Sequence, residues 1–366
     1  MRLVKASLDI DGILEKALDG QRISEEEGLL LLKARGDDLL AVALAADRLR
    51  KERAGDEVTY VVNRNINFTN ICIGKCRFCA FRRESNDDDA YFMDIPQVAA
   101  RAREAKDMGA TEVCIQGGLH PDVDVEFYAG LLNAIKENGN SLHTHAYSPM
   151  EIYYAARQSG ISIRETLEYL KKNGLDSIPG TAAEILDDAV RETICPGKIS
   201  SGKWVDIVRE AHMLGIPTTA TMLYGHVESP EERMRHLAIL RDLQDETNGF
   251  TEFVPLSFVH FNTPLFHSGL AKSGATGIED LLVCAVSRIF LDNFRNIQAS
   301  WIKLGRKFAQ VMLNFGANDL GGTLMEENIS RAAGIRVEMA TPEELQRMIL
   351  DAGREPVQRD TLYNAI

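Results

Sequence analysis

Residues 67–81 read Asn-Phe-Thr-Asn-Ile-Cys-Ile-Gly-Lys-Cys-Arg-Phe-Cys-Ala-Phe and hold half of the six cysteines in the chain. Cys72, Cys76 and Cys79 stand in a C-x3-C-x2-C spacing. Three thiolates this close together can hold one cuboidal iron–sulfur cluster, whereas most four-iron clusters take four cysteine ligands. A local set of three leaves one iron without a protein ligand, much as a catalytic zinc site keeps one position open. The segment therefore predicts a [4Fe-4S] cluster whose open iron can bind a small molecule directly.

A structural zinc site with a distant fourth ligand is the alternative interpretation of these cysteines. Zinc sites favour paired C-x2–4-C elements at two places in the chain. The other cysteines, Cys114, Cys195 and Cys284, are isolated from one another. Clustered cysteines in a chain of this length also differ from the evenly spaced cysteines of a secreted disulfide scaffold. The pattern favours the iron–sulfur cluster.

The charge of the chain limits the partners that it can have. The 366 residues carry a formal net charge of −13. An acidic field repels phosphate backbones and is not attracted to anionic membranes, so we expect neither nucleic acid nor membrane as a partner. No apolar run approaches the roughly 18–20 residues that span a bilayer. The first residues, Met1–Asp11, turn acidic too soon for a signal peptide, and we expect a cytoplasmic protein.

From Val58 onward, short apolar or β-branched segments alternate with helical segments, which predicts βαβ units and a parallel sheet. The expected strands are Tyr60–Phe68, Glu112–Ile115, Leu142–Ala146, Ser177–Ile178, Thr218–Leu223, Glu252–Phe258, Ile297–Trp301 and Met312–Phe315. The expected helices include Ile95–Met108, Asp124–Asn138, Ile163–Asn173, Lys203–Leu214 and Glu231–Leu243. Eight units predict an α/β fold of the closed (βα)8 TIM type, with an open doubly wound sheet as the alternative.

Three regions follow from this pattern. Residues 1–57 are predicted to form a helical extension, in which Ser24–Glu27 has the sequence of a capping box. Residues 58–334 would form the barrel. Residues 335–366 would form a tail whose helix starts at a second capping box, Thr341–Glu344, and packs outside the barrel.

Polar and glycine-rich clusters follow strand after strand, and this observation favours the barrel. They are Asn70–Cys79, Gln116–Gly118, His143–His145, Pro179–Thr181, Tyr224–His226 and Asn318–Gly322. A barrel brings the carboxyl ends of all its strands to one face, where active sites of this fold lie. We therefore expect these clusters to converge.

The cysteine segment resembles the signature of the radical S-adenosylmethionine (SAM) superfamily, which has an aromatic residue before the last cysteine of C-x3-C-x2-C. The resemblance implies that the open iron chelates the amino and carboxylate groups of SAM, and that reductive cleavage yields methionine and a 5′-deoxyadenosyl radical. It also implies that Phe78 packs near the adenine and that the backbone of Gly117 and Gly118 meets the SAM amino group. Gln116 belongs to the same cofactor-binding segment, although its order Gln-Gly-Gly departs from the commoner Gly-Gly-Glu.

Longer blocks resemble one branch of this superfamily, the tyrosine-dependent subunits of Fo synthase, also called 5-amino-6-(D-ribitylamino)uracil–L-tyrosine 4-hydroxyphenyl transferases. The blocks lie in order at 63–70, 111–121, 178–186, 218–226, 250–260, 293–301 and 314–322. The resemblance implies that the radical abstracts hydrogen from the amino group of L-tyrosine. The Cα–Cβ bond then breaks, 2-iminoacetate leaves, and the 4-hydroxybenzyl group adds to 5-amino-6-(D-ribitylamino)uracil.

The resemblance also implies two protein partners. The adduct would pass to another radical SAM subunit that completes the deazaflavin Fo, the chromophore of coenzyme F-420. Because this chain has one cluster motif, that subunit would be a separate protein. An electron donor would reduce the cluster.

Several single residues are candidates for the site. The resemblance implies that Glu184 contacts SAM, and the alternative is an acidic residue favoured by a helix N-terminus. Tyr224 and His226 end the fifth strand in Tyr-Gly-His and are candidates for substrate contact, whereas the alternative for His226 is a hydrogen-bonded loop histidine.

Two further sets of candidates come from strand positions. His143 and His145 are two residues apart and share one face of their strand; we expect His145 to bind substrate, with a metal pair as the alternative. Asn318 and Asp319 precede two glycines and would bind ribityl hydroxyls or the polar groups of tyrosine. The alternative there is a helix N-cap by Asp319.

Other functions remain open at this point. The aminofutalosine synthase and the futalosine cyclase of menaquinone synthesis resemble the same branch, but the blocks around the strands favour the tyrosine transferase. A non-catalytic zinc-binding protein is the alternative from a different class. Iron and sulfide analysis after anaerobic reconstitution separates that alternative from a radical enzyme.

Overall fold

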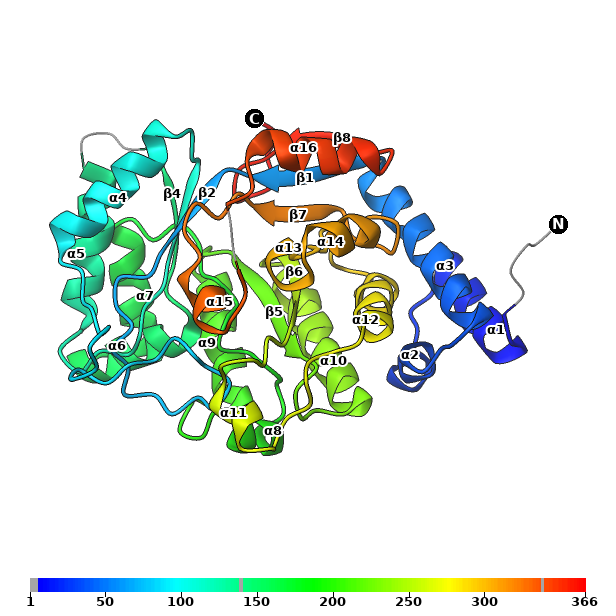
Figure 1. Cartoon of the computed structure of the whole chain (residues 1–366), viewed down its shortest axis with the longest axis horizontal. Coiled ribbons are helices and arrows are strands. Elements are labelled where there is room, and N and C mark those ends of the chain that lie inside the picture. Colours follow the sequence, from blue (N-terminus) through cyan, green and yellow to red (C-terminus); the bar gives the residue numbers. More distant parts are fainter. Residues whose placement is uncertain (1–5, 138–140, 337–338) are drawn as a thin grey trace.

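The computed structural model describes residues 6–137, 141–336 and 339–366. The fold is α/β with parallel strands, and the helices lie around the strands (Figure 1). Residues 1–5 lie outside the described residues; they belong to the segment Met1–Asp11, whose acidity is not typical of a signal peptide. Asn138, the last residue of one predicted helix, also lies outside them. In the part of the chain that is described, no helix is long and apolar enough to cross a membrane.

The strands form three small parallel sheets that bridges connect into one series. They are β1 (Glu57–Val61), β2 (Asn63–Ile66), β3 (Glu112–Ile115), β4 (His143–Ala146), β5 (Thr218–Tyr224), β6 (Phe250–Ser257), β7 (Asp319–Gly322) and β8 (Glu355–Gln358). The sheets have the orders β2-β3-β4, β5-β6 and β7-β1-β8. Ser177 and Ile178 bridge β4 to β5, whereas Ile297 and Gln298 bridge β6 to β7. β7 pairs with β1, and only Val62 separates β1 from β2 along the chain.

The predicted helices are present within a few residues of their expected bounds. The helices are α1 (Leu8–Leu18), α2 (Glu25–Leu32), α3 (Asp37–Ala54), α4 (Ile95–Asp107), α5 (Val125–Lys136), α6 (Pro149–Ser159), α7 (Ile163–Lys172), α8 (Asp188–Ile194), α9 (Ser201–Met213), α10 (Pro230–Thr247), α11 (Pro264–His267), α12 (Gly277–Phe290), α13 (Trp301–Leu304), α14 (Arg306–Met312), α15 (Asn328–Ala332) and α16 (Pro342–Asp351). Both predicted capping boxes are formed: the Ser24 and Thr341 hydroxyls each accept from the N3 amide of α2 and α16. The N-terminal helices pack on one side of the strands, with α2 against α10 and α3 against α12.

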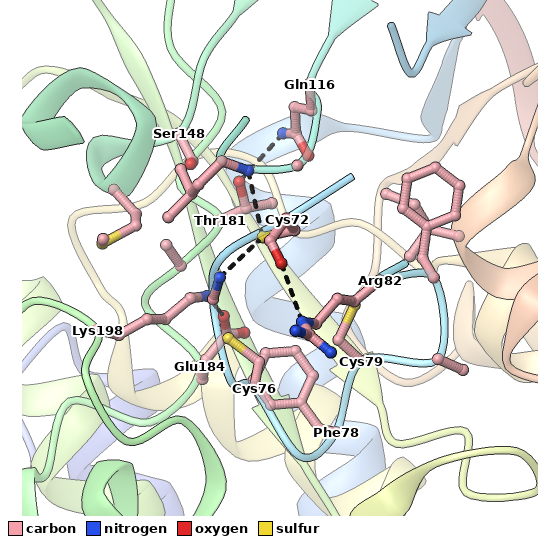
Figure 2. Close-up of a pocket in the computed structure, with 18 of the residues that line it drawn as sticks. Cys72, Cys76, Phe78, Cys79, Arg82, Gln116, Ser148, Thr181, Glu184 and Lys198 are labelled. Carbon is pink, nitrogen blue, oxygen red and sulfur yellow. Dashed lines mark hydrogen bonds and ion pairs between the residues drawn. The ribbon is translucent and has the colours of Figure 1, made fainter. Parts of the chain in front are cut away.

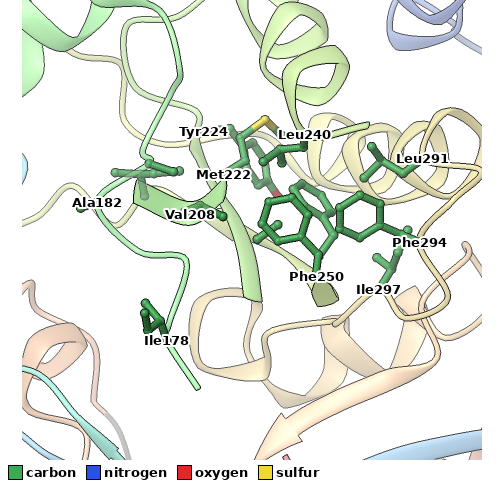
Figure 3. Packing of buried hydrophobic residues seen from close by; sticks show 14 of the residues in the cluster. Ile178, Ala182, Val208, Met222, Tyr224, Leu240, Phe250, Leu291, Phe294 and Ile297 are labelled. Carbon is green, nitrogen blue, oxygen red and sulfur yellow. The ribbon is translucent and has the colours of Figure 1, made fainter. Parts of the chain in front are cut away.

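The main core lies between the strands and the surrounding helices. Figure 3 shows one part of it, where Phe250 of β6 and Phe294 stack with ring centroids 5.4 Å apart. Met222 of β5 and Ile297 lie in the same cluster, together with Leu240 of α10. Burying side chains of this size stabilises a fold by about 1.5–3 kcal/mol each. The packing therefore fixes the strands that carry the site.

The prediction of a strand over Met312–Phe315 is wrong. These residues end α14 and form a turn, and the strand in this region is β7, which starts at Asp319. β7 ends in two glycines, although glycine usually weakens a strand. A Cβ at Gly322 would come within 2.0 Å of Asn63 Oδ1, so glycine is required there for close packing against β2. Of the other expected strands, the first divides into β1 and β2, Leu142 precedes β4, and Glu252–Phe258 is found at Phe250–Ser257. The expected strands Ser177–Ile178 and Ile297–Trp301 are reduced to isolated bridges, and Trp301 begins α13.

The tail contains more than the predicted helix. After α16, β8 pairs in parallel with β1, and this strand was missed. Beyond β8, Arg359 Nε donates to Asp319 Oδ2 (2.6 Å), and Tyr363 Oη donates to Glu252 Oε2 (2.5 Å). These acceptors lie at the starts of β7 and β6. The tail therefore covers the N-terminal ends of the strands, and the division into regions 1–57, 58–334 and 335–366 stays a prediction.

Candidate active site

A cavity of about 280 Å³ lies at the C-terminal ends of the strands, and all three clustered cysteines line it (Figure 2). The segments after β2, β3, β4 and β6 contribute to its wall, as do Leu223 of β5 and the segments 181–184 and 196–198. The prediction that polar clusters after successive strands converge is confirmed for 70–79, 116–118 and Thr181. In a parallel α/β fold this end of the strands is where ligands bind.

Backbone hydrogen bonds hold the cysteine loop in place. Cys72 N donates to Arg83 O (3.1 Å), and Arg77 N donates to Ile194 O (2.8 Å), so both sides of the loop are tied to other segments. The Arg82 guanidinium donates from Nε to Cys72 O (2.9 Å). The thiols therefore sit on a braced segment, although the loop belongs to no helix or strand.

The chemistry of the donors fits an iron–sulfur cluster. Cys72 Sγ accepts from the amides of Gly74 (3.3 Å) and Leu119 (3.2 Å), and amide donors to sulfur stabilise a thiolate and tune a cluster's potential. Burial raises the pKa of Cys76 to about 12 and also raises the pKa of Cys79, so both thiols need a bound cation to ionise. Among the described residues, no three His, Cys, Asp or Glu side chains converge on a point that a single metal ion could occupy.

Gly117 and Gly118 lie on the cavity wall and have no room for a side chain. A Cβ on Gly118 would come within 2.2 Å of Ile71 O, and a Cβ on Gly117 within 2.5 Å of the Phe68 ring. The Gly117 amide donates to Glu151 Oε1 (3.0 Å), and Gln116 Nε2 donates to Thr181 Oγ1 (3.0 Å). The contact of this segment with SAM stays a prediction, but its strict need for glycine has a packing cause.

An ion pair lies beside the cysteines. Lys198 Nζ is 2.7 Å from Glu184 Oε1 and 5.2 Å from the centroid of the Phe78 ring, and Figure 2 shows all three near Cys76. Burial lowers the pKa of Lys198, but its interactions with Glu184, Cys76 and Cys195 outweigh this effect, and the net shift of the pKa is upward. Glu184 has a positive φ of 47°, a backbone conformation that costs about 1–3 kcal/mol and is common at functional sites.

Further polar residues line this cavity that were not predicted from the sequence, among them Lys198, Glu151, Lys303 and Asn67. Lys198 follows a Pro-Gly turn signal that could have marked a loop over the site. Glu151 has the position of an ordinary capping residue in α6, and burial raises its pKa. Asn67 Oδ1 is buried and has no hydrogen-bond partner among the residues that the structure describes, so it is available to a ligand.

The five predicted substrate residues do not line this cavity. Tyr224 follows the lining residue Leu223 and points to the opposite side of β5, where its hydroxyl donates to Asp280 Oδ1 (2.7 Å). His226 is fully buried with Nε2 2.9 Å from Leu223 O, which matches the alternative of a hydrogen-bonded loop histidine.

His145 and the Asn318–Asp319 pair lie elsewhere in the fold. His143 and His145 share one face of β4 as predicted, because both rings contact Ser177 Oγ (2.7 and 2.6 Å), and burial lowers the pKa of His145 to about 4. The prediction that Asn318 and Asp319 follow the last strand is wrong: they precede and begin β7, at the end away from the cysteines. Asp319 caps no helix either, and its carboxylate binds Arg359.

Comparison with known proteins agrees with this geometry. The family model of the radical SAM superfamily matches residues 66–240, and a model described as the CofH/MqnC C-terminal region matches residues 247–366. The chain is 53% identical over 356 residues to the 5-amino-6-(D-ribitylamino)uracil–L-tyrosine 4-hydroxyphenyl transferase of Methanothermobacter thermautotrophicus, covering 97% of each chain. It is 55% identical over 352 residues to the protein of the same name from Methanocaldococcus jannaschii, covering 94% of this chain and 98% of that one. The chain belongs to this transferase family, within the radical SAM superfamily.

Solved structures with low sequence identity support the fold of this radical SAM chain. Methylornithine synthase superposes with a TM-score of 0.74 at 19% identity, covering 94% of this chain and 97% of that one. A maturase of the [FeFe]-hydrogenase superposes with a TM-score of 0.75 at 18% identity, covering 96% of this chain and 77% of that one. The family model and the similar transferases confirm the expected family, and the cluster and SAM are its cofactors.

Proposed function

We propose that the chain transfers the 4-hydroxybenzyl group of L-tyrosine to 5-amino-6-(D-ribitylamino)uracil in the synthesis of Fo. One observation carries the proposal: three cysteine thiols face a cavity at the C-terminal ends of the strands, in a chain more than half identical along almost its whole length to relatives of that name. The products would be the hydroxybenzyl-dihydrouracil adduct, 2-iminoacetate, methionine and 5′-deoxyadenosine.

The residues of the cavity suit this chemistry. Cys72, Cys76 and Cys79 would hold the [4Fe-4S] cluster, which together with SAM would supply the 5′-deoxyadenosyl radical. The apolar wall, with Met150 and Leu256, excludes water from a reactive centre. A buried carboxylate such as that of Glu151 can hold an amino group through charge-assisted hydrogen bonds.

We propose that residues near the cysteines bind SAM as the family resemblance implies. Phe78 would pack near the adenine, and the segment Gln116–Gly118 would meet the amino end. Glu184 would accept from SAM, and in that state its bond to Lys198 would be shared or exchanged. Their common place on the cavity wall supports these roles.

We also propose that the strands close into a (βα)8 barrel. The support is the order of pairing: from β2 through β3, β4, Ser177–Ile178, β5, β6, Ile297–Gln298 and β7, the pairs lead back to β1, which continues into β2. Closure would place all loops after the strands around one cavity.

The chain would need two further proteins. A separate radical SAM subunit would convert the adduct to Fo, since this chain has one C-x3-C-x2-C motif. A reductant protein would deliver the electron that SAM cleavage consumes. The cytoplasmic location stays a prediction of the sequence.

An anaerobic turnover assay tests the proposal. The reconstituted enzyme is given SAM, a chemical reductant, L-tyrosine and 5-amino-6-(D-ribitylamino)uracil, and products are measured by mass spectrometry. We expect 5′-deoxyadenosine formation to depend on tyrosine and the adduct to require both substrates. Unchanged deoxyadenosine yield without tyrosine would contradict the transferase assignment.

A further inference from the structure

A second cavity, of about 580 Å³, lies beside the first. Its walls come from the segment after β6, the loop before α12, and the helices α12, α13 and α14. Phe258, Val259 and Lys303 line both cavities, so the two adjoin at the C-terminal ends of the strands. The volume falls within the range of about 300–1,000 Å³ that is usual for small-molecule sites.

The second cavity offers polar groups and flat rings together. Ser257, His260, Ser273 and Asp280 line it. Asp280 is buried, and the bond from Tyr224 Oη to its Oδ1 (2.7 Å) fixes the orientation of the carboxylate. The rings of His260 and Phe261 lie 4.2 Å apart at its wall. A ligand with several hydroxyls and a planar ring matches such a lining, because hydroxyls both donate and accept and a planar ring can stack.

The chemistry of the reaction assigns the two cavities. Hydrogen abstraction requires the tyrosine amino group to lie against SAM, and therefore in the cavity that the cysteines line. The acceptor has a ribityl chain and a uracil ring. It must reach the benzyl carbon without displacing SAM or tyrosine from the first cavity. We propose that the second cavity binds 5-amino-6-(D-ribitylamino)uracil, with the shared wall at Lys303 as the place where the two substrates meet. This inference rests on the proposed function.

Lys303 is suited to a positioning role at that junction. Of the three side chains that line both cavities, Lys303 is the charged one, since Phe258 and Val259 are apolar. Of the three hydrogens of its ammonium, one is donated to Ser330 Oγ (2.7 Å) in the described part of the chain. Burial lowers the pKa of Lys303, and the carboxylates of Glu327 and Glu184 oppose this only in part. The amine can therefore donate to a substrate carbonyl or carboxylate at the boundary.

Substrate affinities test the assignment without turnover. Reconstituted holoenzyme with SAM and no reductant is dialysed to equilibrium against each substrate. His260→Ala removes a polar ring from the second cavity, and Ser273→Trp fills it from an exposed loop. We expect each variant to raise the Kd of the aminouracil at least tenfold and to change the Kd of tyrosine less than twofold. His267→Ala, at an exposed position in α11 outside both cavities, is the matched control and should change neither.

The outcomes separate this inference from the proposed function. If wild-type enzyme binds the aminouracil and both variants keep its affinity, the second cavity is not its site. If the variants weaken tyrosine instead, the assignment of the two cavities is reversed and the inference is wrong. If wild-type enzyme binds neither substrate, the proposed function itself is wrong. Iron content and unfolding temperature equal to those of the wild type show that a variant is folded.

Discussion

The two ends of the strands both carry buried charged and polar groups, but they use them differently. At the N-terminal end, the Asp319 carboxylate is bound by Arg359 and the Glu252 carboxylate by Tyr363, both from the tail. At the C-terminal end, cysteine thiols and the Asn67 carbonyl face a cavity. One end is satisfied by the chain itself and the other is arranged for ligands.

This difference shows what marks a site in this fold. Buried polar groups occur at both ends, so burial alone does not identify function. The distinguishing features are donors and acceptors that the protein leaves to a ligand, and glycines that let the backbone approach it. Four substitutions test this difference, two at the N-terminal ends of the strands and two at the C-terminal ends.

The largest effect is expected for Cys76→Ala. The variant should lose the cluster and all SAM cleavage while keeping its helical content, because the cysteine lies on a loop outside the helices and strands. Iron and sulfide analysis, circular dichroism and deoxyadenosine assays measure this. Cys284→Ala, in the core of α12, is the control and should keep the cluster. Full activity of Cys76→Ala would contradict the placement of the catalytic site at the C-terminal ends of the strands.

Lys198→Met should have the next largest effect, on stability. Removing one partner of a buried ion pair costs about 3–5 kcal/mol because the other charge is left unpaired. Here that charge is the Glu184 carboxylate, 2.7 Å from the lysine. The double variant Lys198→Met/Glu184→Gln should regain most of the loss in urea unfolding. It should nevertheless bind SAM about tenfold more weakly, as expected for loss of one charged hydrogen bond. Wild-type SAM affinity in the double variant would make the pair purely structural, like the pairs at the other end.

Sequence reasoning succeeded where function lies in a short contiguous segment. The cysteine spacing fixes its own geometry within eight residues, and Gln116–Gly118 lies directly after a strongly apolar strand. The helices were also predictable, since capping residues such as Ser24 and Thr341 act locally. These features depend on neighbours in the chain, which the sequence displays.

The errors arose where function depends on register or on distant partners. The last strand of the series was placed a few residues early, which moved Asp319 from one end of the strands to the other. Tyr224 was predicted to lie in the site, but successive side chains of β5 point to opposite faces of the sheet. Its neighbour Leu223 faces the cavity, so Tyr224 points away from it. In the tail, Arg359 binds Asp319, 40 positions earlier in the chain, and Tyr363 binds Glu252, 111 positions earlier. No local sequence pattern predicts such contacts.

Glu252→Gln should change how stability depends on pH. Burial raises the pKa of Glu252 to about 7 in the folded protein, from an ordinary value of 4.5. A raised carboxyl pKa means that folding favours the protonated form, so this stabilisation is complete below pH 4.5 and is lost as the pH rises to about 7. The wild type should therefore lose up to about 3 kcal/mol relative to Glu252→Gln between pH 4.5 and pH 7.5. Urea unfolding of both proteins at several pH values measures the difference. Parallel curves would show that the network at the N-terminal end holds Glu252 ionised throughout.

The smallest effect is expected for Tyr363→Phe, which tests whether the tail closes the N-terminal end. The ring and its stacking under the Arg359 guanidinium (3.9 Å) are kept, and only the bond to Glu252 is lost. A hydrogen bond to a charged acceptor contributes about 1.5–3 kcal/mol, so urea unfolding near pH 8 should show a loss of about 1.5 kcal/mol. Tyr169→Phe removes the same kind of bond, to Glu126 on the surface, and should change stability little because water replaces it. If the two variants behave alike, the tail bond is as dispensable as a surface contact, and the contrast between a closed end and a ligand-binding end fails. A larger loss in Tyr363→Phe means that the tail stabilises the strands from the end opposite the chemistry.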